Sequence, residues 1–446
     1  MDRPIHRVVN LIDDGAQQIR NMSLDDARAR LRGAPARVLE IDGSFALAAR
    51  DGELVLMARS LDRPMRYFLA KEVAGPMLVI GERIDEIAVE LGRRGYAAQF
   101  HPSYTRMVPA HHVTALRLVG CPDPTPEQRR FFAPPRATLP PDLDVIGAAY
   151  ADALSAEVAG WLAAQDAREP LGVLFSGGVD STAVLVALYR ELLARGDSPA
   201  RLKAFTLAVD GGGPDLAQAR DTLRALDLEL LHEVVDMPAD ELDPLDAVAV
   251  IEDYKPLDVE CATMVLALLR GIRRRHPDWR LVVDGDGGDE NLKDYPLDPG
   301  GELTIRSVVS NSMLYQEGWG VEAIKHSLTY SGGLSRGCVR GYAPARRLGF
   351  VGYSPFTRPA LVRTAEAIPF DTLTGGSNAR LYALKGEIVR RGLRQRYGVD
   401  IPAPDKRRFQ HGAAAPEAFA RRVAAPPERY RAHFNGLWGG AGPTPA

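Results

Sequence analysis

The sequence predicts an α/β protein of two domains, in which the second and larger domain is built on a doubly wound parallel sheet. Two features predict this organisation. From about residue 145 onward, helical segments alternate with short apolar segments typical of buried strands. Before that point lie shorter strand-like segments, and a proline-rich stretch at 121–144 separates the two regions. We therefore expect domains at residues 1–125 and 145–430, a stiff linker at 126–144 and a flexible tail at 431–446.

The first region contains several short strands. Residues 38–58 form two apolar segments of alternating character around an Arg-Asp-Gly turn, which predicts a β-hairpin. Further strands are expected at 66–70 and 77–80.

In the second region, segments with the apolar spacing of a helix alternate with short apolar segments typical of strands. Helices are expected at 145–165, 181–195 and 215–227, and strands at 171–175, 202–208 and 280–284. In an open parallel sheet the ligand crevice lies at the carboxyl ends of the strands. Both glycine-rich motifs of the chain follow strands in this way.

Composition excludes several classes of protein. Charged residues make up 25% of the 446 residues and the formal net charge is -3, so no basic surface predicts a nucleic-acid partner. The three cysteines are far apart, which suits a reducing compartment and no disulfide framework. No hydrophobic leader core and no long apolar run is present, so we expect a cytoplasmic protein without a membrane partner.

The first motif is Ser-Gly-Gly-Val-Asp-Ser, at residues 176–181, between an apolar strand and a helix. Gly177 and Gly178 allow backbone N–H groups to approach an anion at the positive end of the helix. Ser176 and Ser181 add hydroxyl donors. Asp180 is a natural ligand for Mg²⁺ that bridges phosphate oxygens. The motif therefore predicts a pyrophosphate site, and the alternative is a glycine-rich turn that serves packing alone.

The second motif is VVDGDGGDE, at residues 282–290. Four carboxylates fall within seven residues, at Asp284, Asp286, Asp289 and Glu290. Such a cluster is expected beside a cation or a reacting amine, because the charges otherwise repel one another. An acidic, solvated loop is the alternative.

The two motifs together resemble the synthetase domain of asparagine synthetases and their relatives, the β-lactam and carbapenam synthetases. The first motif resembles the signature of the ATP pyrophosphatases, which split ATP into AMP and pyrophosphate. The resemblance implies ATP binding by Ser176, Gly177, Gly178, Asp180 and Ser181, with Leu174, Leu207 and Gly285 beside them, and Mg²⁺ bound by Asp180 and Asp289. It also implies that Asp286, where asparagine synthetases have Glu and β-lactam synthetases have Tyr, assists the attacking amine.

Two later segments extend the resemblance. The sequence PAPDKRRFQHG at 402–412 is similar to a basic segment of the family, which implies that Lys406 stabilises the charge of the transition state; a solvated basic run is the alternative. The segment 329–356 is similar to the one that lines the acceptor pocket, which implies that Tyr330 and Tyr353, with Glu290, contact substrate. The acidic residue that the family has after Pro-Phe is absent here, where Pro355-Phe356 is followed by Thr357 and Arg358.

The amino-terminal half resembles the glutaminase domain of asparagine synthetase over residues 41–70. This implies a degenerate αββα sandwich of the N-terminal nucleophile hydrolase kind. The cysteine nucleophile of that family is missing after Met1, and the first cysteine is Cys121. We therefore expect no glutaminase activity.

These observations predict an ATP-dependent, AMP-forming carbon–nitrogen ligase that adenylates a small-molecule carboxylate and captures it with an internal or separate amine. The expected reaction is a glutamine-independent amidation like that of β-lactam synthetases, in the biosynthesis of a specialised metabolite such as an antibiotic. The alternatives are an ammonia-dependent asparagine synthetase and a non-catalytic nucleotide-binding homologue. The sequence leaves the substrate and the oligomeric state open, a homodimer among the possibilities.

Overall fold

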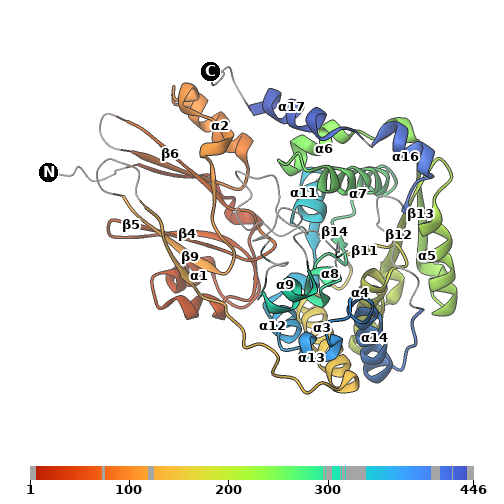
Figure 1. Cartoon of the computed structure of the whole chain (residues 1–446). Helices are drawn as coiled ribbons and strands as arrows, with labels where there is room; N and C mark the ends of the chain where they lie inside the picture. Colours follow the sequence, from red (N-terminus) through yellow and green to blue (C-terminus); the bar gives the residue numbers. More distant parts are fainter. Residues whose placement is uncertain are drawn as a thin grey trace.

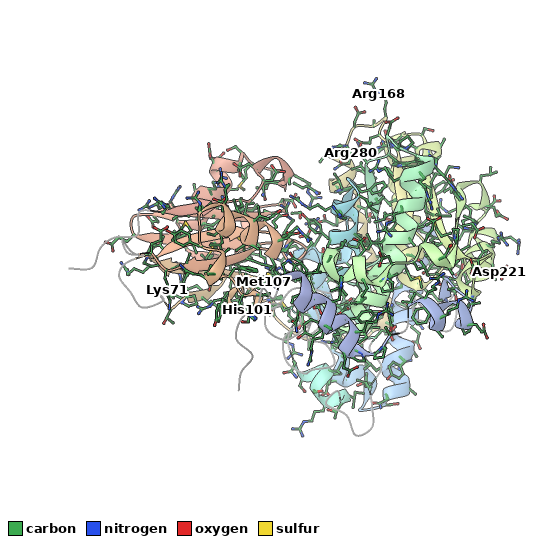
Figure 2. All side chains as sticks on the ribbon, turned by 90° about the horizontal axis from the view of Figure 1, so that it is seen from above. Lys71, His101, Met107, Arg168, Asp221 and Arg280 are labelled. Atoms are coloured by element: carbon green, nitrogen blue, oxygen red, sulfur yellow. The ribbon has the colours of Figure 1, made fainter. Side chains whose placement is uncertain are left out.

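The chain folds into two domains that lie side by side, seen in perpendicular directions in Figures 1 and 2. This computed structural model describes residues 7–72, 76–118, 125–294, 304–311, 338–402, 412–423 and 425–438, together with Leu297, Met313 and Glu317. No helix among these residues is long and apolar enough to cross a membrane.

The first domain has four layers, in the order helix, sheet, sheet, helix. One sheet has the strand order β1 (Val8–Asn10), β7 (Met77–Gly81), β6 (Arg66–Ala70) and β8 (Arg106–Met107). The other has the order β10 (Glu127–Arg130), β9 (His112–Arg117), β5 (Leu54–Arg59) and β4 (Ala46–Asp51). Helix α1 (Leu24–Leu31) covers the second sheet and α2 (Ile84–Arg93) covers the first. A short pair, β2 (Gln18–Ile19) and β3 (Gly43–Ser44), lies beside them.

Alternating side chains explain these layers. In β5, Val55 and Met57 point into the core between the sheets, whereas Leu56 and Ala58 pack toward α1. A strand that is apolar on both faces must be covered on both. The predicted hairpin is therefore confirmed as β4 and β5, with its turn at the Arg-Asp-Gly sequence.

The second domain contains a five-stranded parallel sheet. Its strand order is β13 (His232–Met237), β12 (Leu202–Val209), β11 (Leu171–Leu174), β14 (Leu281–Val283) and β15 (Val351–Tyr353). In β14, Leu281 and Val283 face the core formed with α3, α4 and α14, and Val282 faces the core formed with α7. Helices thus cover both faces of the sheet, which confirms the doubly wound α/β prediction.

The helices of this domain are distributed along the whole second half of the chain (Figure 1). They are α3 (Leu143–Ala163), α4 (Val179–Arg195), α5 (Pro214–Ala225), α6 (Pro244–Ile251), α7 (Pro256–Arg275), α8 (Gly288–Leu292), α9 (Ile305–Ser310), α11 (Ala343–Arg347), α12 (Pro359–Glu366), α13 (Phe370–Thr374), α14 (Asn378–Tyr397), α16 (Pro416–Arg422) and α17 (Pro427–Trp438). A single π-helical turn, η8 (Cys338–Tyr342), precedes α11. Short 3-10 turns occur at Asp14–Ala16, Pro35–Glu40, Ala97–Gln99, Pro102–Tyr104, Pro199–Arg201, Glu229–Leu231, Ala239–Glu241 and Pro355–Thr357.

The structure differs from the expected boundaries at two places. Strand β10 lies within the expected linker, where it pairs with β9 and so belongs to the first domain. The expected tail begins inside α17, which reaches Trp438. Phe434 and Trp438 are buried against α6, and this apolar contact orders a segment that composition alone suggests is mobile.

Candidate functional site

The two glycine-rich motifs meet at the carboxyl ends of β11 and β14, which are neighbours in the parallel sheet. Their backbones are in contact: a Cβ atom added at Gly285 would lie 2.9 Å from the backbone nitrogen of Ser181, and one at Gly288 would lie 2.3 Å from Asp180 Oδ1. Only glycine permits so close an approach. Motifs that are about one hundred residues apart therefore form one site, as the sequence predicts.

The first motif forms an anion cradle. Gly177 has φ +75°, a conformation that favours glycine, and Gly178 is the N-cap of the 17-residue helix α4. The Ser176 hydroxyl accepts a hydrogen bond from the Gly178 nitrogen at 3.2 Å and lies 3.3 Å from the Ser181 hydroxyl. Backbone donors, two hydroxyls and a helix N-terminus thus face the same point. Leu174 ends β11 beside this cradle, and Leu207 lies near the end of the adjacent strand β12.

A lysine lies among the carboxylates of the two motifs. The ammonium of Lys385, on α14, contacts both Asp180 and Asp289, and it is 3.5 Å from Asp294 Oδ2. Although burial alone would lower the pKa of Lys385, these carboxylates hold it well above its usual value. Sequence reasoning assigned no role to Lys385. It is 205 residues from Asp180 in the chain, and no spacing signal connects them.

This arrangement also tests the predicted magnesium site. Asp180 and Asp289 contact one and the same cationic group, so one cation at that point is within reach of both. Within the part of the chain that the structure describes, no group of three His, Cys, Asp or Glu side chains is arranged to hold a metal ion. Mg²⁺ is commonly bound by one or two carboxylates together with substrate phosphates, so Asp180 and Asp289 fit a Mg²⁺ that is bound together with a nucleotide.

Two further carboxylates, the buried Asp284 and the half-buried Asp286, lie close together in the second motif. Burial raises the pKa of Asp284 to about 6, although hydrogen bonds from the Ser354 hydroxyl and the Asp286 backbone favour its charged form. Burial, and next the charge of Asp284, raise the pKa of Asp286 well above its usual value. Asp286 is thus a stronger base than an exposed aspartate.

The π-helical turn η8 covers this pair. A Cβ atom at Gly341 would lie 2.6 Å from Asp284 Oδ2 and 3.1 Å from Asp286 Oδ2, so the backbone passes directly over both carboxylates. Arg340 in the same turn bonds the buried Asp258 at 3.1 Å, and its charge partly offsets the rise in the pKa of Asp286. Sequence analysis missed η8 and Arg340. Their only sequence signal is the density of Gly and Arg in that segment.

The predicted substrate residues are placed differently from one another. Glu290 follows Asp289 in α8, is buried, and is close enough to Asp286 to raise its pKa. The backbone oxygen of Tyr353 accepts a hydrogen bond from the Asp284 nitrogen at 3.1 Å. Its side chain faces away from the motifs: the ring stacks on Trp161 and the hydroxyl donates to Glu157 at 2.9 Å. Tyr353 therefore adjoins the site through its backbone.

Two predicted residues, Tyr330 and Lys406, lie outside the described residues. The chain is described again from Gly412, and the Ala413 oxygen accepts a hydrogen bond from the Val209 nitrogen at 3.0 Å. This contact places Ala413 at the carboxyl end of β12, the end of the sheet at which the two motifs lie.

A comparison with protein families agrees with this geometry. The model of the asparagine synthase family matches residues 150–311, a segment that contains both motif loops. Members of this family are ATP-dependent carbon–nitrogen ligases. The second domain of this chain therefore contains an asparagine synthase family segment at residues 150–311.

Proposed function

We propose that this protein is an AMP-forming ligase that adenylates a small-molecule carboxylate and captures it with an amine, without using glutamine. The observation that carries the proposal is the contact between the anion cradle at residues 176–181 and the carboxylate loop at 284–290. A phosphate-binding turn and a proton acceptor at one point suit a reaction in which adenylation precedes attack by an amine.

In the first step the cradle binds the ATP phosphates and the substrate carboxylate attacks the α-phosphorus, releasing pyrophosphate. Backbone N–H groups of the cradle and the hydroxyls of Ser176 and Ser181 hold the leaving phosphates. The ammonium of Lys385 lies at the Asp180 end of the cradle, where it offsets negative charge on the phosphates. Mg²⁺ held by Asp180 and Asp289, when bound, supplies further charge neutralisation.

In the second step the amine attacks the acyl-adenylate, and the amide forms as AMP leaves. Asp286 accepts the proton that the attacking nitrogen loses, because its raised pKa makes it a better proton acceptor near neutral pH. Asp284 tunes this base through its charge. From the family resemblance we assign Lys406 the stabilisation of charge on the acyl-adenylate, and Glu290 and Tyr330 contacts to the substrate.

The composition of the first domain supports a nitrogen source other than glutamine. No cysteine occurs among residues 1–120, and a glutaminase of the family's kind uses a cysteine thiol as its nucleophile. We infer that the amine belongs to the substrate itself or to a second substrate, as in β-lactam synthetases, and that the product is a specialised metabolite. The carboxylate at position 286, where asparagine synthetases also have an acid, favours ammonia-dependent asparagine synthesis as the second candidate.

The experiment is an assay of pyrophosphate release with ATP and MgCl₂ over a panel of amino-acid substrates, with and without ammonia, followed by mass spectrometry. Turnover without ammonia to a product one water lighter than the acid supports the first candidate. Strict dependence on ammonia with aspartate supports the second. The variant Asp286→Asn should lose amide formation, whereas Asp221→Asn, at an exposed position of α5, should not. Absence of pyrophosphate release with every acid would contradict both.

A further inference from the structure

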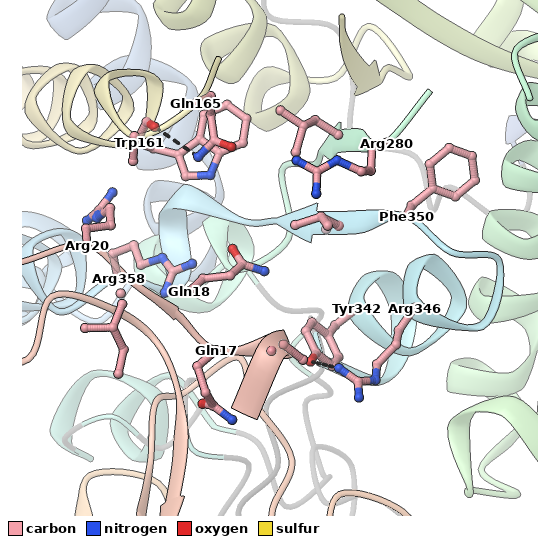
Figure 3. A pocket seen from close by; sticks show the side chains of 18 residues that line it. Gln17, Gln18, Arg20, Trp161, Gln165, Arg280, Tyr342, Arg346, Phe350 and Arg358 are labelled. Atoms are coloured by element: carbon pink, nitrogen blue, oxygen red, sulfur yellow. Dashed lines mark hydrogen bonds between the residues drawn. The ribbon is translucent and has the colours of Figure 1, made fainter. Parts of the chain in front are cut away.

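A cavity lies between the two domains and is lined by residues of both. Its volume is about 570 Å³, within the range of small-molecule sites. The first domain contributes residues 15–20 and Gly43, and the second contributes the end of α3 and the starts of β14 and β15 (Figure 3). Arg280 and Leu281 lie at the start of β14, whereas the second motif follows the end of that strand. Tyr342, the last residue of η8, also lines the cavity, so the cavity reaches the turn that lies over Asp284 and Asp286.

The cavity is rich in hydrogen-bond donors. Four arginines and three glutamines line it, and none of its lining residues is Asp or Glu. In Figure 3 the guanidinium groups of Arg280, Arg346 and Arg358 are arranged around the side chain of Gln18. A ligand suited to such a wall presents several acceptor oxygens.

Three of the four arginines are held by carboxylates that do not line the cavity. Arg280 makes a bidentate contact with Glu169, at 2.7 and 3.0 Å, and Arg358 is 3.3 Å from Asp62. Arg20 is 2.9 Å from Glu157. These pairs orient the guanidinium groups in advance, which reduces the entropy that a ligand must remove on binding.

Arg346 differs from the other three arginines. Its carboxylate contact is Glu82 at 3.4 Å, and Glu82 is also the partner of the buried Arg63. Two guanidinium groups thus share one carboxylate, which leaves positive charge at this part of the wall. The Arg346 side chain is 34% exposed and lines the cavity, so a ligand in the cavity can reach its guanidinium group.

We propose that this interdomain cavity binds a small oxyanion, a metabolite that carries carboxylate or phosphate groups, with Arg346 as the main charged contact and the Gln18 amide as a further donor. None of the residues that line the cavity belongs to the motif loops at 176–181 and 284–290, and the proposal does not depend on the reaction proposed above. Carboxylates and phosphates share the chemistry that this wall recognises, so the test includes a probe for each.

The test is isothermal titration calorimetry of the full chain with citrate and with inorganic phosphate, at constant ionic strength. We expect saturable binding of at least one probe, weakened roughly tenfold or more in Arg346→Gln. The variant Gln18→Met, which removes the amide at similar size, should weaken it less. Arg168→Gln, at a side chain that is 95% exposed and outside the cavity, should bind as the wild type does (Figure 2).

The nucleotide cradle is the competing anion site, and Ser176→Ala separates the two. Binding that survives Ser176→Ala and is weakened in Arg346→Gln and Gln18→Met supports the proposal. Absence of saturable binding, binding unchanged in both cavity variants, or binding abolished by Ser176→Ala would overturn it. Thermal melts of each variant identify any loss of affinity that comes from unfolding.

Discussion

Replacing Lys385 with methionine should destabilise the synthetase domain and abolish most of its activity. The substitution keeps the apolar stem and removes the ammonium, which leaves Asp180, Asp289 and Asp294 without the cation that they share. Removing one partner of a buried ion pair costs about 3–5 kcal/mol. At about 2.1 cal/mol/K of unfolding entropy per residue, a domain of roughly 290 residues loses about 1.6 °C of Tm for each kcal/mol, so we expect Tm to fall by roughly 5–8 °C.

Magnesium provides a specific readout for this prediction. If one cation can lie between Asp180 and Asp289, excess MgCl₂ without nucleotide should restore part of the lost Tm in Lys385→Met and change the wild type little. Pyrophosphate release should fall about 10²–10³-fold, because a charge beside the phosphates is missing. Lys71→Met, at an exposed lysine of the first domain, is the matched control (Figure 2). The reasoning is refuted if Lys385→Met melts as the wild type does, or if Mg²⁺ stabilises both proteins equally.

Three further predictions concern other parts of the site and the domain contact. The folded-state pKa of Asp284, about 6, lies above its usual value of 3.8, so its stabilising contribution is full below the usual value and is lost as pH rises through 6. Urea unfolding should therefore show the advantage of the wild type over Asp284→Asn falling by about 2 kcal/mol between pH 4 and 6, and a pH-independent difference would contradict this. The same variant should move the acidic limb of kcat/KM to lower pH, because the charge at 284 raises the pKa of Asp286. Gly285→Ala should reduce pyrophosphate release, because its Cβ would press on the backbone of the first motif. Gly92→Ala, which has open space around it, should leave activity intact. Equal rates of the two variants would exclude the contact between the motifs. Asp62→Asn should lower the unfolding free energy by about 3–5 kcal/mol, because it leaves the buried Arg358 of the second domain without this carboxylate. Unchanged denaturant melts would argue against coupling of the domains.

The ion pair between Asp62 and Arg358 also makes the contact between the domains sensitive to acid. Burial alone would raise the pKa of Asp62, but Arg358 and the hydroxyls of Ser44 and Ser60 outweigh it, so the pKa lies below its usual value. This stabilising contribution is present above the usual pKa and is lost as pH falls through the folded-state value.

The sequence by itself determined the local features of this protein. The helix and strand periodicities predict the elements of the second domain. The order of strand, glycine-rich turn and helix predicts an anion site at residues 176–181. These features depend on interactions between residues close in the chain, such as turns that need glycine and helices that begin at a cap. The hairpin of β4 and β5 is local in the same way.

Only the tertiary structure decided which distant groups meet. Lys385 contacts carboxylates from both motifs because α14 packs beside α4 and α8, and no periodicity carries that information. The orientation of Tyr353, away from the motifs and toward Glu157, follows from the alternation of side chains along β15 and from the helix that covers that face. The pKa of Asp286 likewise depends on burial under η8, because the cost of charge in a poorly solvated site is set by everything packed around it.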